Sequence, residues 1–217
     1  MDGIDHLFKI TSIESRKKKK EKHFEAFVHW PSEGNLLRQV RLTAIETVQK
    51  KPSSYWEHRY NDGTNTKKWM SLPVSGKLKE ITGKKVGKKD FSFSDLSVTE
   101  KDINSHNHNI LNLEKVDTLS AYVILLIKKN KKGKVKESKK MWIDTEHYMI
   151  MKVEFYTRSG RLYRRVECSG FHYLNKILFP KNIIVQDFKS KNDFQITITD
   201  IELDPVFDRG IFIPKDQ

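Results

Sequence analysis

Three stretches contain residue types that could do chemistry, but none has the spacing that its chemistry needs. Gly83–Lys89, GKKVGKK, resembles a phosphate-binding loop but is one residue short, lacks the Ser or Thr that binds Mg²⁺, and precedes no clear helix. His106-Asn107-His108 offers two imidazoles without a third ligand at a recognisable spacing, which favours a solvated polar loop. Cys168 falls within an expected strand and fits a small buried hydrophobe. We expect no metal and no cofactor.

Motifs for covalent catalysis are also missing. The sequence contains no G-x-S-x-G motif and no paired-carboxylate motif, so nucleophilic and glycosidic chemistry have no carrier. We therefore expect no catalytic residues and no enzyme activity.

The chain is strongly basic. Its 217 residues include 41 Lys and Arg against 28 Asp and Glu, a net charge of +13. This charge favours a polyanion or an anionic membrane as a neighbour, although abundant Lys, Asn and Ile also fit a compositional bias without function. The single cysteine excludes an internal disulfide. The longest apolar stretch, Leu119–Ile127, is far shorter than the roughly 20 residues of a membrane-spanning helix.

Residues 139–170 predict three consecutive antiparallel strands, around which the rest of the chain is arranged. The odd positions of Tyr148–Tyr156 are all apolar: Met149, Met151, Val153 and Phe155. A period of two places one face of a strand against apolar groups and the other in water. Lys139–Thr145 precedes this strand, and a loop ending at Gly160 leads into Arg161–Ser169.

Similar patterns predict most of the remaining chain to be strands. They lie at Phe8–Ile13, His23–Trp30, Leu36–Val48, Tyr55–Tyr60, Lys67–Leu72, Leu78–Thr82, Leu119–Ile127, Asn182–Phe188 and Asp193–Ile201. Many short strands, tight turns and almost no amphipathic helix indicate one mostly β domain, an antiparallel barrel or strongly curved sheet. We expect this single domain to span residues 1–217, with residues 1–6 as a start without structure.

Two kinds of segment interrupt the strand pattern. Phe91–Asn112 lacks alternation and ends in a polar Asn/His stretch, so we expect a loop with one or two short helical turns. Tyr173–Pro180 is expected to be a connection. The lysine-rich runs Arg16–Lys20 and Lys128–Lys140 are expected to be exposed hairpin tips that approach anionic membranes, where each basic residue contributes about 1 kcal/mol.

Several short motifs follow one another in a specific order. They are Trp69–Pro73 (WMSLP), Lys79–Ile81 (KEI), Asp90–Leu96 (DFSFSDL), Trp142–Asp144 (WID) and Lys152–Tyr156 (KVEFY). In order and spacing they resemble the W-x-Y-L-P … R-R-I … S-D-F-x-Y-x-D-L … W-I-D … K-x-E-x-Y progression of the outer-membrane lipoprotein-sorting protein family. The similarity is to its LolA-like branch, often encoded beside RND-type (MMPL) exporters.

The resemblance implies a fold and a function. The fold would be a curved, incomplete antiparallel β-barrel of the LolA/LolB type, with a short helix or loop plug. The function would be that of a bacterial periplasmic carrier or receptor, with its signal segment removed or with a membrane tether. It would bind acyl chains of lipoproteins or lipids for transport to the outer membrane, in partnership with an RND-type (MMPL) exporter.

Strand phase and the resemblance together predict a lipid-binding cavity. The phase of each strand gives its wall: Phe24, Val28, Trp30, Val40, Leu42, Trp69, Met149, Met151, Val153, Phe155, Ile196 and Ile198. The resemblance places Phe91, Phe93 and Leu96 at its mouth. The same apolar positions also fit an ordinary core that no ligand enters.

Two other functions stay open from the sequence. One is an envelope-stress sensor that binds a lipidated protein on the same fold. The other is a basic module that binds polyanions. Specific nucleic-acid binding is not expected, because most aromatic rings fall on the apolar strand face rather than on a solvent-facing platform.

Overall fold

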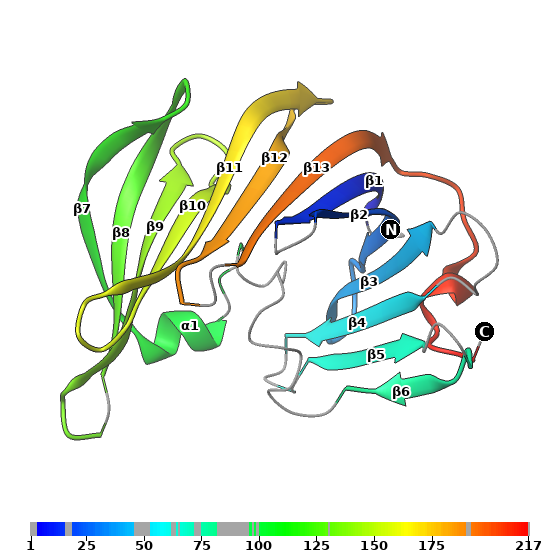
Figure 1. Cartoon of the computed structure of the whole chain (residues 1–217), viewed down its shortest axis with the longest axis horizontal. Helices are drawn as coiled ribbons and strands as arrows, with labels where there is room; N and C mark the ends of the chain where they lie inside the picture. Colours follow the sequence, from blue (N-terminus) through cyan, green and yellow to red (C-terminus); the bar gives the residue numbers. More distant parts are fainter. Residues whose placement is uncertain are drawn as a thin grey trace. The chain divides into compact units, whose positions relative to one another are not determined.

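The computed structural model describes most of the chain as β-strands (Figure 1). The residues described are 4–15, 19–45, 53–61, 64, 66–71, 75–81, 96, 98, 100–129, 131–189 and 192–216. The strands of the first half are β1 (Ile4–Ser15), β2 (Lys19–Trp30), β3 (Leu36–Ile45), β4 (Ser54–Tyr60), β5 (Lys67–Ser71) and β6 (Leu78–Glu80). Those of the second half are β7 (Asn107–Val116), β8 (Leu119–Lys129), β9 (Val135–Asp144), β10 (Ile150–Tyr156), β11 (Leu162–Leu174), β12 (Ile177–Asp187) and β13 (Asn192–Leu203). A short helix, α1 (Glu100–Ser105), and a 3₁₀ turn, η2 (Arg209–Phe212), complete the described elements.

The described strands form one 13-stranded sheet in the order β6-β5-β4-β3-β2-β1-β13-β12-β11-β10-β9-β8-β7. Each pair whose register is defined is antiparallel. The order begins at β6 and ends at β7, so the sheet is open. The expected mostly β, antiparallel and incomplete architecture is therefore confirmed.

Backbone contacts divide the chain into two compact units. Unit 1 comprises Met1–Ser12, Glu21–Lys88 and Ile198–Gln217. Unit 2 comprises Ile13–Lys20 and Lys89–Thr197. That residues 1–217 act as a single domain stays a prediction.

In unit 1 the C-terminal segment covers one face of the sheet, which we call the tail face. Residues directly opposite across neighbouring strands share a face. Phe27 and Arg41 are such a pair, and Arg41 is in turn opposite Trp56. The indole Nε1 of Trp56 donates to the carbonyl of Ile211 at 3.0 Å. The ring of Phe212, only 1% exposed, is thereby held against the sheet.

In unit 2 the strands β7 to β12 form a simple meander. Val153 is opposite Val166, which is opposite Val185, and all three are at most 1% exposed. Met141 of β9 and Ile124 of β8 continue this row on the same face, which we call the pocket face. Burying such a row removes apolar area from water at roughly 25 cal/mol per Å² and so stabilises the meander.

A β-bulge in β10 separates residues that strict alternation would place together. The register shifts between Ile150 and Lys152, so Met151 is an extra residue on this strand. Met151 packs in a buried cluster with Val123 and Trp142, which are opposite each other and turned away from the pocket face. Val153, opposite Met141, stays on the pocket face.

Three expectations about elements need correction. The Asn/His stretch from Asn107 to Asn112 is not a loop but belongs to β7, although α1 matches the expected helical turn. Tyr173–Pro180 is not a connection, because β11 and β12 are joined by a two-residue turn at Asn175 and Lys176, both with positive φ. Residues 4–6 belong to β1. Residues 46–48, at the end of the third expected strand, lie outside the described residues.

Candidate apolar binding site

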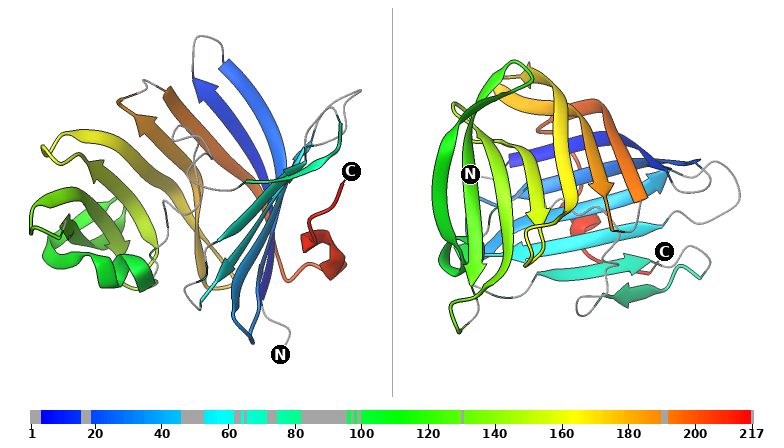
Figure 2. Two further views of the ribbon diagram at one scale, coloured as in Figure 1. Left: turned by 90° about the horizontal axis from the view of Figure 1, so that it is seen from below. Right: turned by 60° about the vertical axis from the view of Figure 1, so that its left-hand side comes forward.

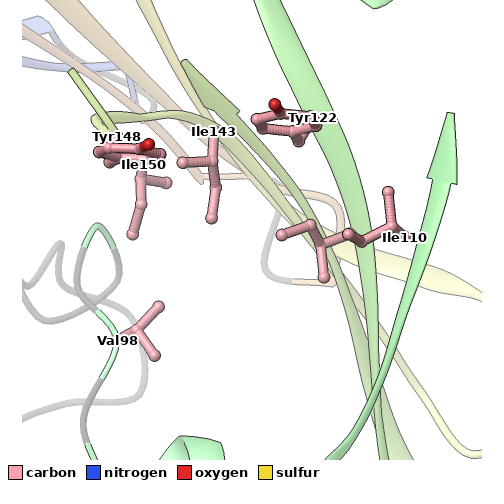
Figure 3. A pocket seen from close by; sticks show the side chains of 7 residues that line it. Val98, Ile110, Tyr122, Ile143, Tyr148 and Ile150 are labelled. Atoms are coloured by element: carbon pink, nitrogen blue, oxygen red, sulfur yellow. The ribbon is translucent and has the colours of Figure 1, made fainter. Parts of the chain in front are cut away.

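An apolar pocket of about 470 Å³ opens on the pocket face of unit 2. Its lining residues are Val98, Ile110, Tyr122, Ile124, Ile143, Tyr148 and Ile150. Figure 3 shows the side chains of Ile143, Tyr148 and Ile150 gathered on one side, with Val98 across from them. The volume falls within the range of roughly 300–1,000 Å³ that is typical of small-molecule sites.

Four of the lining side chains are unusually exposed. Tyr148 is 73% and Ile110 is 70% exposed, while Val98 and Tyr122 are 38% and 37% exposed. Keeping this much apolar surface in water has a free-energy cost that packing in the described residues does not remove. A bound apolar group would remove it.

Register explains how these residues come together. Ile110 is opposite Ile124 across β7 and β8, and Tyr122 is opposite Ile143 across β8 and β9. Ile143 is in turn opposite Ile150 of β10. Four neighbouring strands therefore each contribute to one surface.

The turn between β9 and β10 places Tyr148 beside the pocket. The carboxylate of Asp144, 2% exposed, accepts from the backbone N–H groups of Glu146 at 3.1 Å and His147 at 2.6 Å. The backbone N–H of Asp144 donates to the carbonyl of Met149 at 2.9 Å, which closes the turn. Tyr148 itself has φ of 55°, a left-handed conformation that is uncommon for a residue with a large side chain.

The pocket offers hydrophobic contact and two hydroxyl groups, and none of the described residues that line it is charged. The thiol of Cys168 is buried elsewhere on the pocket face, and burial raises its pKa to about 12, so it is not a nucleophile at neutral pH. Among the described residues no group of three metal-binding side chains is found. The arrangement is suited to holding an apolar ligand.

In the described part of the chain, no helix is both long enough and apolar enough to cross a bilayer.

The expected cavity residues of unit 2 fall into two groups. Val153, Phe155 and Ile196 lie on the pocket face, but they are 8% exposed or less and do not line the pocket. Met149 and Met151 belong to the cluster around Trp142. The bulge in β10 therefore places the two methionines away from the pocket face.

The expected cavity residues of unit 1 also divide by register. Val28 is opposite Val40, and Phe24, Trp30 and Leu42 share their face. Trp69 is opposite Trp56 and so lies on the tail face instead. Ile198, the first residue of β13 that belongs to unit 1, is half-buried. Whether any of these residues binds lipid stays a prediction.

A buried ionic group lies on the same face as Val40. Glu57, 6% exposed and opposite Val40, accepts from Arg38 at 2.7 Å and from the hydroxyl of Tyr55 at 2.9 Å, and Lys68 is 3.3 Å away. Burial alone would raise the pKa of Glu57, but the charges of Arg38 and Lys68 and these hydrogen bonds outweigh it and lower the pKa. This face of unit 1 is therefore not uniformly apolar.

The expected mouth residues are only partly described. Leu96 is half-buried and precedes by two residues Val98, which does line the pocket. Phe91 and Phe93 lie outside the described residues.

The sequence-based prediction missed all seven lining residues. Leu119–Ile127 is apolar at nearly every position, so the phase of Tyr122 and Ile124 could not be assigned from periodicity. One lining residue had a usable signal in the sequence. Ile143 is two positions after Met141, so the period of a strand places both side chains on the same face.

A family model described as "-like: Uncharacterized protein" matches residues 42–216. The chain belongs to this family. A comparison with curated proteins gives no match.

Solved structures show which fold the family has. An outer membrane lipoprotein-sorting protein domain from Vibrio parahaemolyticus superposes with a TM-score of 0.76 at 20% identity, covering 96% of this chain and 89% of that one. A DUF1329 family protein from Desulfovibrio piger gives 0.77 at 16%, covering 97% and 90%. A LolA superfamily protein from Nitrosomonas europaea gives 0.60 at 16%, covering 97% and 90%. The chain therefore has the LolA-like fold that the order of its sequence motifs predicts.

Proposed function

We propose that the protein is a non-enzymatic carrier or receptor that holds an acyl chain of a lipid or lipoprotein in the pocket of unit 2. It works in the periplasm of a bacterial envelope, and it passes its cargo from an RND-type (MMPL) inner-membrane exporter toward the outer membrane.

The observation that carries this proposal is the apolar lining of the pocket, of which four side chains are well exposed. Each buried methylene contributes about 0.8 kcal/mol, so an alkyl chain gains affinity from such a surface without any charged partner. Tyr122 and Tyr148 can direct a hydroxyl to the polar end of a ligand. The LolA-like fold supports the same assignment.

A fatty-acid titration of delipidated protein tests the proposal. Ile110→Asp places a carboxylate in the pocket lining, and a charge among apolar groups is costly. Because Ile110 is 70% exposed, the fold should tolerate the change. We expect uptake of a fluorescent fatty acid to weaken at least about tenfold, or 1.4 kcal/mol.

Ile213→Asp is the matched control, because Ile213 is 63% exposed and lies in unit 1. It should bind the fatty acid as the unchanged protein does. No uptake by the unchanged protein, or equal losses in both variants, would contradict the proposal. If the unchanged protein does take up the fatty acid, mass spectrometry of lipid that co-purifies with it identifies the natural cargo.

We further propose that the hairpin Lys128–Lys140 brings the protein to anionic membranes. This hairpin contains eight lysines and one glutamate, so it holds +7 of the net charge of +13. Lys129, Lys131, Lys132, Lys134 and Lys136 are exposed as expected, whereas Lys128, Lys139 and Lys140 are half-buried. Of the other expected tip, residues 16–18 and the side chains of Lys19 and Lys20 lie outside the description.

Replacing Lys131, Lys132, Lys134 and Lys136 by Gln should weaken co-sedimentation with anionic liposomes by about 1 kcal/mol per lysine at low salt. Replacing Lys22, Lys77, Lys79 and Lys215, which are also exposed, changes the net charge equally. This control should retain most of the binding, since its lysines are scattered. Equal losses in both variants would mean that net charge alone acts.

A further inference from the structure

Strand β7 presents an edge of the sheet that no described strand pairs with. One side of β7 pairs with β8 from Asn107 opposite Ile127 to Val116 opposite Leu119. β7 is also the last strand in the sheet order, and Figure 2 shows it as the outermost strand of unit 2. Within the described part of the chain, no strand pairs with the backbone N–H and C=O groups on its other side, which suit a further strand.

The composition of β7 differs from that of a protected edge. Asn107–Leu113 contains no Lys, Arg, Asp, Glu or Pro, although 32% of the chain is charged. Its large side chains are well exposed: Ile110 is 70%, Leu111 50% and Leu113 63% exposed. Natural edges are usually shielded by charges, prolines or short length. In β7 the charged residues Glu114 and Lys115 lie at its C-terminal end, and a bulge lies between Ile110 and Asn112, so the stretch Asn107–Leu113 is left without a charge or proline.

The apolar residues of β7 lie on a defined face. Ile110 is opposite Ile124 and Leu113 is opposite Tyr122, so both extend the pocket face. Leu113 does not line the pocket itself. An added strand with apolar side chains at alternate positions would pack on Ile110 and Leu113.

Charge indicates which kind of strand would dock there. The Asn107 end of β7 is beside Ile127, from which β8 continues into the lysine hairpin Lys128–Lys140. A second copy would bring another net charge of +13 to the same place, which is repulsive. A peptide with acidic residues at that end would instead be attracted.

We propose that β7 binds an extended segment of a partner protein by antiparallel strand addition. The segment has apolar side chains at alternate positions, followed on its C-terminal side by acidic residues. Antiparallel addition, which all defined pairs of this sheet follow, places these acidic residues at the Asn107 end beside the hairpin. Backbone hydrogen bonds give affinity, while the alternate side chains and the acidic end give specificity. This interaction goes beyond lipid binding and does not require the pocket to be filled.

A labelled peptide of alternating threonine and valine ending in three glutamates tests the proposal by fluorescence anisotropy. Leu111→Lys together with Leu113→Lys places two charges on the exposed edge and should weaken binding at least about tenfold. Val206→Lys, at a fully exposed apolar position of unit 1, is the matched control and should have no effect. Amide hydrogen exchange in β7 should slow when the peptide binds.

Two further measurements address orientation and charge. The same peptide with its three glutamates at the N-terminus should bind more weakly, because antiparallel addition then places them at the Val116 end. Replacing Lys131, Lys132, Lys134 and Lys136 by Gln should weaken binding of the first peptide and reduce its dependence on salt. Equal binding of the two peptides would overturn the proposed orientation.

Absence of peptide binding, or binding unaffected by Leu111→Lys together with Leu113→Lys, would overturn the proposal. So would a dimer of the unchanged protein, seen by analytical ultracentrifugation, that the same substitutions dissociate, since a second copy would then occupy β7. Fatty-acid uptake is measured in parallel on every variant. Loss of peptide binding with uptake retained separates this site from the pocket.

Discussion

Tyr148 combines a disfavoured backbone conformation with a position at the pocket. The left-handed region costs a residue with a Cβ roughly 1–2 kcal/mol, whereas Asn visits it readily. Tyr148→Asn should therefore keep or slightly raise the melting temperature while weakening fatty-acid binding several-fold, because a 73% exposed ring that lines the pocket is lost. Titration and thermal melts on the same sample measure both effects.

Lys176→Asn is the control for this prediction, since Lys176 also has a positive φ, of 67°, but lies in the turn between β11 and β12. It should change the melting temperature in the same direction and leave fatty-acid binding unchanged. A Tyr148→Asn protein that binds with full affinity would remove Tyr148 from the site.

Met151 provides a second prediction at the level of one residue. Strict alternation predicts that Met151 faces a ligand, so that Met151→Asp would abolish uptake before it lowers stability. The structure shows Met151 fully buried beside Val123 and Trp142. Met151→Asp should therefore lower the free energy of unfolding by several kcal/mol. Met70→Asp, at a 37% exposed position of β5, should cost far less in chemical denaturation. Equal costs would contradict the observed packing.

At the level of elements, the C-terminal segment gives unit 1 a dependence on pH. His58 donates from Nε2 to the carbonyl of Phe212 at 2.9 Å. Burial lowers the pKa of His58 below its ordinary 6.5, opposed by the carbonyl of Phe212 and assisted by Lys67. Between the folded-state pKa and 6.5, the unfolded chain binds more protons than the folded protein. Stability should therefore fall as the pH decreases below about 6.5.

Chemical denaturation at a series of pH values measures this effect. His58→Gln keeps an N–H donor for Phe212 but cannot titrate, so its stability should vary less between pH 7 and the folded-state pKa. If the two proteins lose stability in parallel, His58 is not the responsible group.

The sequence predicts those elements that have one buried and one exposed face. Val153 and Phe155 were placed correctly relative to each other, because β10 alternates after its bulge. The bulge itself has no sequence signal in this chain, so Met151 was placed on the wrong face. β7 was missed because both of its faces are exposed, which removes alternation, and because Asn and His are poor strand formers. The turn at Asn175 and Lys176 was missed because it contains no Gly.

The candidate site depends on register between strands, which a single sequence does not provide. Ile110, Ile124, Ile143 and Ile150 become neighbours only through three strand pairings. In the sequence Ile110 falls in the expected loop and Ile150 on the polar side of its strand, while Ile124 and Ile143 look like ordinary core positions. The fold was therefore recognisable from the order of its motifs, while the pocket was not.

At the level of the whole molecule, the chain visits the strands of its sheet in an unusual order. Every strand lies beside the one that follows it in the sequence, except β6 and β7, which are the two ends of the sheet. The sheet is instead made continuous by β1 and β13, which are neighbours although they are far apart in the sequence. The hydroxyl of Thr199 donates to the carbonyl of Lys9, 190 positions earlier in the chain. Closing such a long loop is entropically costly and slows folding.

A circular permutant would remove this long-range step without changing the sheet. A chain that begins at Lys89, joins Gln217 to Met1 through a flexible linker and ends at Lys88 would visit β7 to β13 and then β1 to β6, each beside its predecessor. Its lower contact order should give faster refolding in stopped-flow measurements, with β1 and β13 now formed locally. A permutant opened at Gly133 has the same linker but separates β8 from β9, and it should refold more slowly than the first. If the two permutants refold equally fast, closure of the loop between β1 and β13 does not limit the folding rate, and the order of the strands along the chain does not slow folding.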